Sequence, residues 1–273
     1  MRVLKALIRR IFTIKKVVHL DITYAVPSNR FAGKRVLVTG GTSGIGFACA
    51  KAFISEGAKV LICARKANHL DAALRELQSD SAMSMVLDVA NVGEIKGRID
   101  TATEKLGGKI DVFVNCAGVS AYNGGIMDEK MYDYICDVNT RGLYFMNQYE
   151  GDYMIKNGIH GKIVNITSKA GERIGFDPYT LSKWGANAIT RGNARRLAPH
   201  HINVNGVAPG RVPTHITAEL EQHINTGNAF TPNHATQRFT MPDEVASMVL
   251  YLSSGVANNI VGQIIVMDGG SYN

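Results

Sequence analysis

Short runs of apolar and β-branched residues recur along the chain from Lys34 onward, separated by longer stretches with helical spacing. The runs lie at 35–38, 59–63, 83–87, 110–114, 163–166, 202–207 and 263–266. They are nearly continuous in apolar residues, as expected for parallel strands that are covered on both faces. Segments between them, such as 45–56 and 68–77, are long enough for crossover helices. The pattern predicts a single α/β domain with a doubly wound parallel sheet of about seven strands and helices on both faces.

The first 33 residues fall outside this alternation and hold most of the net charge. Residues 1–16 carry six basic side chains and no acid, whereas residues 17–273 carry 24 basic and 23 acidic ones. Leu4, Leu7, Ile8 and Ile11 lie close to helical spacing among these charges. Three alternatives stay open: a basic helix on an anionic membrane surface, packing against this chain or a second subunit, and a loose extension. We divide the chain into a basic amphipathic extension and linker, 1–33, and one folded domain, 34–273.

Composition excludes several classes of protein. The apolar runs are too short for a membrane span, and we find no signal-peptide core with a small-residue cleavage site. Four cysteines without Cys-x-x-Cys pairing or zinc spacing indicate reduced thiols and no metal site. Because the positive charge belongs to the terminal segment, it predicts no nucleic-acid face. We expect a cytoplasmic protein, with peripheral membrane contact through residues 1–16 as an open alternative.

A glycine-rich turn follows the first predicted strand and opens the first predicted helix. It reads Thr-Gly-Gly-Thr-Ser-Gly-Ile-Gly over residues 39–46. Gly40 suits a tight turn, Gly44 lets the backbone approach a pyrophosphate, and Gly46 permits close helix–sheet packing. The helix N-terminus offers free N–H groups to phosphates. A plain strand-to-helix loop is the alternative, but the position favours a Rossmann-type dinucleotide site that includes Thr39, Gly40, Ser43, Gly44, Ile45 and Gly46.

The end of the second predicted strand bears on the choice of cofactor. An acidic residue there would bind the ribose hydroxyls of NAD, but the chain has Ala64 followed by Arg65 and Lys66. A guanidinium is planar, always charged and able to form two parallel bonds, which suits a 2′-phosphate. The alternative is a solvated pair of charges in a loop. The sequence therefore favours NADP(H) over NAD(H).

Tyr179 and Lys183 stand four positions apart in a segment with helical character. Residues at this spacing share one face of a helix. An unperturbed phenol titrates near pH ~10, and a fixed ammonium beside it favours the phenolate, so the pair suits acid–base chemistry. Ser168, near the end of a predicted strand, could orient a carbonyl oxygen toward the phenol. The spacing also arises by chance in a chain with ten tyrosines, so the pair alone proves little.

Taken in order, these motifs resemble the classical short-chain dehydrogenase/reductase family from about Lys34 to Gly270. The resemblance rests on the glycine turn, on Asn-x-Ala-Gly at 115–118, on Asn139 and on the three residues just described. It also rests on Asp88-Val89 after the third predicted strand and on Pro209-Gly210 with Thr214. The cofactor contacts that it implies include Asp88, Val89, Asn115, Ala117, Gly118, Tyr179, Lys183, Pro209, Gly210, Val212 and Thr214.

The resemblance implies a role for each catalytic residue. Tyr179 is expected to protonate a carbonyl during reduction and to act as the base in reverse. Lys183 would ease deprotonation of Tyr179 and hold the nicotinamide ribose, Ser168 would bind the substrate oxygen, and Asn139 would help to hold a water in a proton relay. Asn115 braces the central strand or contacts the ligand. The substrate is expected to be a small carbonyl or alcohol, and the assembly a homo-oligomer, a tetramer or a dimer.

Two features depart from the family pattern: the N-terminal extension, and the spacing of Ser168 and Tyr179, which is 11 positions and about two fewer than usual. The shortened loop brings Glu172 and Arg173 near the expected mouth of the pocket. Residues 211–238 are expected to cover the substrate, with surface histidines at 215, 223 and 234 that lack metal-ligand spacing.

The leading hypothesis is an NADP(H)-dependent reductase or dehydrogenase. Two other functions are alternatives to it. Ser43 replaces the glycine that is typical of sugar-nucleotide epimerases and dehydratases, which argues against that group. A catalytically silent NADP-binding sensor or scaffold should have lost one of Ser168, Tyr179 and Lys183, yet all three are present.

Overall fold

The structure, a computed structural model, describes residues 28–120, 127–214, 217 and 229–271. Seven parallel strands form one sheet in the order β3-β2-β1-β4-β5-β6-β7. The sheet changes direction of winding between β1 and β4, where a doubly wound fold leaves a crevice. The strands are β1 Arg35–Thr39, β2 Lys59–Ala64, β3 Ala82–Val86, β4 Val112–Asn115, β5 Lys162–Ile166, β6 Asn203–Pro209 and β7 Ile264–Met267.

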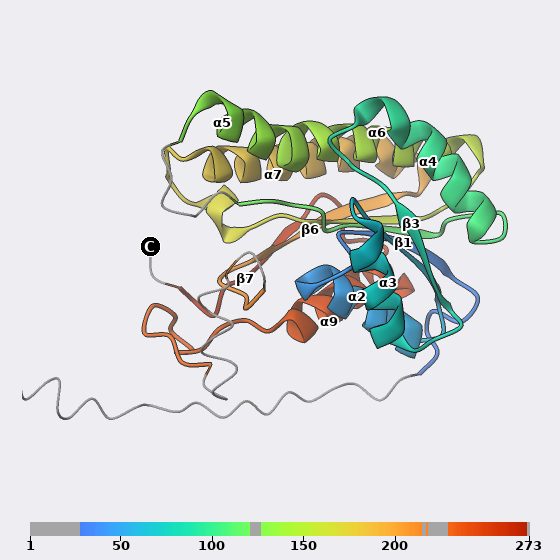
Figure 1. Ribbon diagram of the computed structural model, residues 1–273, viewed down its shortest axis with the longest axis horizontal. Coiled ribbons are helices and arrows are strands. Elements are labelled where there is room, and N and C mark those ends of the chain that lie inside the picture. Colours follow the sequence, from blue (N-terminus) through green and yellow to red (C-terminus); the bar gives the residue numbers. More distant parts are fainter. Residues whose placement is uncertain (1–27, 121–126, 215–216, 218–228, 272–273) are drawn as a thin grey trace, which may run out of the picture.

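Helices cover both faces of the sheet (Figure 1). One layer holds α2 Gly44–Ser55, α3 Ala67–Leu77 and α9 Pro242–Ser253. The opposite layer holds α4 Val92–Lys105, α5 Glu129–Cys136, α6 Leu143–Lys156 and α7 Pro178–Leu197, with the π-helical turn η1 Asp137–Gly142 between α5 and α6. Short 3-10 turns are η2 Lys169–Glu172, η3 Ala198–His200 and η5 Gly255–Ala257. The predicted fold class is confirmed.

Alternate residues of the central strands point to two separate cores. In β1, Val36 and Val38 belong to the core beneath α2 and α9, whereas Leu37 belongs to the core beneath α4, α6 and α7. All three are completely buried. Because both faces of the strand are covered, every position needs an apolar side chain, and this explains the uninterrupted runs in the sequence.

Residues 28–33 pack on the domain, although the sequence grouped them with the extension. The Glu56 carboxylate accepts hydrogen bonds from the backbone N–H groups of Ser28 and Arg30 at 3.2 and 3.1 Å and pairs with the Arg30 guanidinium at 2.6 Å. Phe31 is buried and meets Phe53 of α2 edge to face, with ring centroids 4.9 Å apart. The folded unit therefore begins several residues before Lys34.

The predicted membrane contact of residues 1–16 lies outside the described residues. Within the part of the chain that the structure describes, no helix is both long and apolar enough to cross a membrane.

Candidate active site

A cleft of about 360 Å³ opens at the carboxyl ends of the strands. Its walls come from the residues that follow β1, β2, β3, β4, β5 and β6 and from the start of α7. This is the edge of the sheet where open α/β folds bind ligands, because successive loops diverge there. The predicted residues that line it are Thr39, Gly40, Ser43, Gly44, Ile45, Arg65, Lys66, Asp88, Val89, Ala117, Gly118, Ser168, Tyr179, Lys183, Pro209, Gly210, Val212 and Thr214.

At two positions of the glycine turn, backbone atoms leave no room for a side chain. Gly40 has φ of 66°, and a Cβ there would lie 2.9 Å from the backbone nitrogen of Ala117. A Cβ on Gly46 would run into the carbonyl oxygen of Gly40. Gly46 does not itself line the cleft; it lets α2 start directly against the turn. This agrees with the packing role that its position in the motif indicated.

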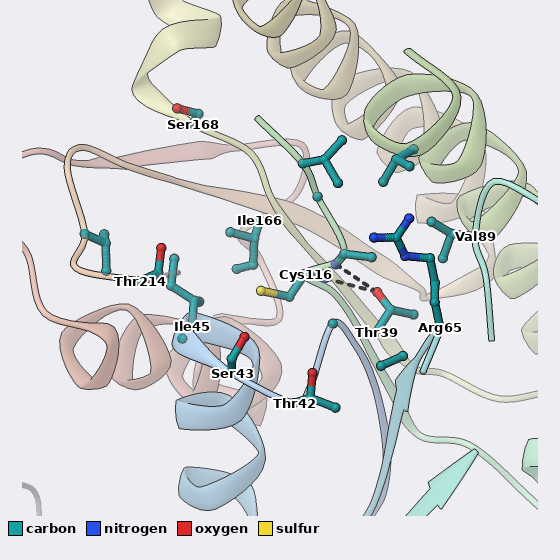
Figure 2. Close-up of a pocket in the computed structure, with 18 of the residues that line it drawn as sticks. Thr39, Thr42, Ser43, Ile45, Arg65, Val89, Cys116, Ile166, Ser168 and Thr214 are labelled. Atoms are coloured by element: carbon teal, nitrogen blue, oxygen red, sulfur yellow. Dashed lines mark hydrogen bonds between the residues drawn. The ribbon is translucent and has the colours of Figure 1, made fainter. Parts of the chain in front are cut away.

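Thr39 joins the glycine turn to the loop after β4. Its hydroxyl oxygen accepts hydrogen bonds from the backbone N–H groups of Cys116 and Ala117, both at 3.2 Å (Figure 2). Ser43 precedes α2 in an extended conformation, and its side chain makes no capping hydrogen bond to the helix. Ser43 thus caps none of the first N–H groups of α2, and Gly44 and Ile45 at this helix start line the cleft, as an anion-binding site requires.

Basic side chains gather at one end of the cleft. Arg65 and Lys66 follow β2, and His69 lies one turn into α3; all three line the cleft. The guanidinium carbon of Arg65 lies 5.7 Å from the ring centroid of Tyr134 on α5, a cation–π arrangement that holds the side chain at the rim. In Figure 2, Arg65 and Thr214 stand on opposite sides of the cleft, with Ile45 and Cys116 between them.

The residues proposed for acid–base chemistry line another part of the same cleft. Tyr179 and Lys183 both lie in the first turns of α7, as their spacing predicted. Lys183 is only 6% exposed, and its ammonium donates to the carbonyl oxygen of Ile166 at 3.3 Å and lies 5.7 Å from the Tyr179 ring centroid. The Ser168 hydroxyl oxygen accepts from the Ala170 N–H at 3.1 Å, which leaves its own hydrogen for another acceptor.

The shortened loop between Ser168 and Tyr179 is a 3-10 turn followed by a helix cap. Ser168 caps η2, and Asp177 caps α7 by accepting from the Thr180 N–H at 2.9 Å. Glu172 is held by Asn187 and Arg191 at 2.8 and 3.1 Å. Its carboxylate is therefore engaged by α7.

Asn139 does not line the cleft but shapes its wall. It lies in η1, is 2% exposed, and its amide exchanges two 2.8 Å hydrogen bonds with the backbone N–H and carbonyl of Val119. It also donates to the Ser182 hydroxyl at 3.1 Å. The side chain thus fixes the loop after β4, and Val119 itself lines the cleft. The role of Asn139 in holding a water stays a prediction.

Asn115 does not line the cleft. The sequence left open whether it braces the central strand or contacts the ligand, and its hydrogen bonds are those of a bracing residue. Its amide nitrogen donates to Glu150 at 2.9 Å and to Asn165 at 3.0 Å. Asn165 continues the network to Asn147 and Thr190. Among the described residues, the second oxygen of Glu150 and the Asn115 carbonyl oxygen are buried without a hydrogen-bond partner. A buried carboxyl group with an unpartnered oxygen and no cation beside it among its hydrogen-bond partners favours the protonated form.

We expect Glu150→Gln to stabilise the protein, and more at alkaline than at acidic pH. Burial raises the pKa of Glu150 to about 8, although the hydrogen bond from Asn115 lowers it. A glutamate in the unfolded chain titrates near pH ~4.3. Between these values the folded state holds a proton that the unfolded state has released, so the free energy of unfolding falls as the pH rises. Glutamine removes this dependence, with a gain on the order of a few kcal/mol at pH ~8.

Urea unfolding at pH ~5 and ~8 measures the difference. The control is Glu94→Gln, which changes an exposed carboxylate paired with Arg98 on α4 and should leave the pH dependence unaltered. Parallel pH curves for the wild type and Glu150→Gln would show that the buried carboxyl does not titrate in this way.

The motifs did not point to several residues of the cleft. His69, Thr42 and Thr217 line it. His69 lies in the first turn of α3, and no motif in the sequence marked it. Cys116 also lines the cleft, and burial raises the pKa of its thiol to about 12, which keeps it protonated.

The expectation of a surface histidine at 234 is wrong. His234 is 2% exposed and packs edge to face on Phe239, because the segment after residue 229 folds back onto the end of β7. Histidines 215 and 223 lie outside the described residues. In the described ranges, no group of three His, Cys, Asp or Glu side chains is arranged to hold a metal ion.

The cleft fits a dinucleotide on three counts. Its glycine turn and the start of α2, which Ser43 does not cap, line the part of the cleft where a pyrophosphate would lie. Arg65, Lys66 and His69 lie at one end of the cleft. The Lys183 ammonium, the Ser168 hydroxyl and the Tyr179 phenol line another part of it. Residues that would hold the cofactor are therefore present along the whole cleft.

Known proteins agree with this assignment. A family model described as enoyl-(acyl carrier protein) reductase matches residues 40–272. The 3-oxoacyl-(acyl-carrier-protein) reductase FabG of Thermotoga maritima is 35% identical over 247 residues, which cover 88% of this chain and 98% of that protein.

Solved structures give the same result. A short-chain type dehydrogenase/reductase from Mycobacterium marinum matches with a TM-score of 0.79 and 31% identity, covering 90% of this chain and 98% of that one. A variant of actinorhodin polyketide ketoreductase, solved with NADPH, matches with a TM-score of 0.76 and 29% identity, covering 88% of this chain and 97% of that one. With its parallel sheet and its glycine-lined cleft, the chain belongs to the classical short-chain dehydrogenase/reductase family of oxidoreductases, which bind a nicotinamide cofactor.

Proposed function

We propose that the protein is an NADP(H)-dependent oxidoreductase that interconverts a carbonyl group with a primary or secondary alcohol. The observation that carries the proposal is that Ser168, Tyr179 and Lys183 line the same cleft as the glycine turn and Arg65. A nicotinamide cofactor supplies the hydride, and the protein supplies orientation and proton transfer.

Each of the three side chains has a separate task in this proposal. The Ser168 hydroxyl donates its hydrogen to the substrate oxygen. Its own oxygen accepts from the Ala170 N–H, a contact that leaves the hydrogen available. The Tyr179 hydroxyl gives its proton to that oxygen as it becomes an alcohol, and takes it back in the reverse direction. The Lys183 ammonium donates one hydrogen to the carbonyl oxygen of Ile166, which leaves two for the nicotinamide ribose. Its positive charge stabilises the phenolate form of Tyr179.

The preference for NADP(H) rests on the basic end of the cleft. Arg65, Lys66 and His69 stand where the second strand ends, and the acid that would favour NAD(H) is replaced by Ala64. The related actinorhodin ketoreductase was solved with NADPH, which supports the same choice.

A turnover assay tests the proposal. The protein is mixed with NADPH or NADH and a panel of 3-oxoacyl thioesters, ketoses, aldehydes and small ketones, and nicotinamide absorbance is followed. We expect oxidation of NADPH with at least one carbonyl, and slower oxidation of NADH. Tight NADPH binding without turnover of any carbonyl would instead favour the sensor or scaffold that the sequence raised as an alternative.

We also propose that the protein acts as a homo-oligomer. Tyr144 on α6 and Leu181 and Trp184 on α7 are each about half exposed, and the two helices pack side by side. Apolar side chains gathered on neighbouring helices are typical of subunit contacts. Light scattering should give the mass of a dimer or a tetramer; a monomer at micromolar concentration would contradict the proposal.

A further inference from the structure

Lys169, the residue after Ser168, binds residues near the C-terminal end of the chain. Lys169 opens η2, and its ammonium pairs with an Asp268 carboxylate oxygen at 2.7 Å. It also donates to the carbonyl oxygen of Ser271 at 2.5 Å and to the Ser271 hydroxyl. The Lys169 and Asp268 side chains are 17% and 16% exposed. With three acceptors, all three hydrogens of the ammonium are used, so its direction is set.

Asp268 lies between the turn that begins at Lys169 and the loop that contains Gly210. It follows β7 and lies against Gly210, where an added Cβ would be 2.9 Å from the Asp268 Cα. The Gly210 N–H donates to the Met267 carbonyl at 2.9 Å. Gly210 lines the cleft on the expected nicotinamide side. The ion pair therefore ties the Ser168 turn to the Gly210 loop.

The Asp268 carboxylate is held from several directions. The Gly270 N–H donates to one oxygen at 3.0 Å and the Ser271 hydroxyl to the other at 3.1 Å. Burial alone would raise the pKa of Asp268, but donation from Lys169, Ser271 and Gly270 outweighs it and lowers the pKa. The same short segment binds residues 235 and 236 through the carbonyls of Gly270 and Gly269.

We propose that Lys169 is a positioning residue, which acts through Asp268 to hold the Ser168 hydroxyl in register with the nicotinamide side of the cleft. The inference rests on the proposed function, in which Ser168 binds the substrate oxygen. A hydroxyl that donates in the transition state must be held closely, because an error of about 1 Å costs about 10²-fold in rate. Glu172 ties η2, the four-residue turn after Ser168, to α7, and the Lys169–Asp268 ion pair ties it to the end of β7.

The test compares kcat, KM and the Kd for NADPH in Lys169→Met, Lys169→Arg and Ser168→Ala. Lys169→Met should lower kcat about 10-fold with NADPH affinity within about twofold, and Lys169→Arg should restore most of the loss. In a Ser168→Ala background, Lys169→Met should lower kcat no further, since the two act through one hydroxyl. An equal loss in both backgrounds would assign Lys169 a general structural role and overturn the inference.

The control is Lys109→Met, which removes an ion pair of the same 2.7 Å length, with Asp111, at the opposite end of the sheet. It should leave kcat unchanged. If the wild type turned over no carbonyl, the proposed function would fail. Amide hydrogen exchange would then test the Lys169–Asp268 ion pair independently of activity. Lys169→Met should then speed exchange in both 168–172 and 268–271, and unchanged exchange in 268–271 would overturn it.

Discussion

Replacing Tyr179 with phenylalanine is expected to lower kcat by about 10²–10⁴-fold, the range that a positioned proton donor contributes. The change removes one oxygen and keeps the ring, whose centroid lies 5.7 Å from the Lys183 ammonium. The contacts of Lys183 with Ile166 and of the glycine turn with α2 are untouched. We therefore expect NADPH to bind with a Kd within about twofold of the wild type.

The measurement pairs steady-state turnover with NADPH fluorescence titration. Tyr251→Phe is the matched control, because Tyr251 is an exposed tyrosine on α9 and loses the same oxygen. Retention of most of the turnover in Tyr179→Phe would contradict its role as proton donor. Loss of NADPH binding in the variant would instead assign the hydroxyl to cofactor binding.

Replacing Arg65 with alanine is expected to weaken NADPH binding and to leave NADH binding nearly unchanged. Loss of a charge-assisted hydrogen bond to a phosphate corresponds to about 1.5–3 kcal/mol, or about 10–150-fold in Kd. NADH lacks the 2′-phosphate, so its Kd should change by less than about threefold. Arg65→Lys should fall between, since an ammonium keeps the charge but not the planar fork.

Lys59→Ala serves as the control, because Lys59 is an exposed cation at the first position of β2, whereas Arg65 follows the last. Titrations at low and moderate salt should show the NADPH effect of Arg65→Ala shrinking as salt rises. An equal loss of affinity for NADPH and NADH would remove the phosphate role from Arg65 and leave its stacking on Tyr134 as its function.

The strands were predictable because both faces of this sheet are buried. Each of the seven apolar runs overlaps an observed strand, and most boundaries differ by one or two residues. β6 continues to Pro209, past the end of its apolar run, because pairing with β7 reaches Met267. Pairing with a neighbouring strand is a property of the sheet, so the run itself could not mark that end.

The site was predictable where a local conformation demands a residue type. Gly40 is required by a positive φ, and Tyr179 and Lys183 share a helix face through their spacing. Asn115 was ambiguous, because a residue at the end of β4 can direct its side chain toward the cleft or toward the core. Packing decided this, since Glu150 and Asn165 offer acceptors inside the core.

The sequence by itself determined the kinds of element, their order and the approximate position of each strand. These depend on periodicity and on local backbone sterics, which are properties of neighbouring residues. Tertiary structure decided which side chains meet: Thr39 with the loop after β4, and Lys169 with Asp268 about 100 positions later. Such contacts follow from strand order and from burial that excludes water, and no short stretch of sequence encodes either.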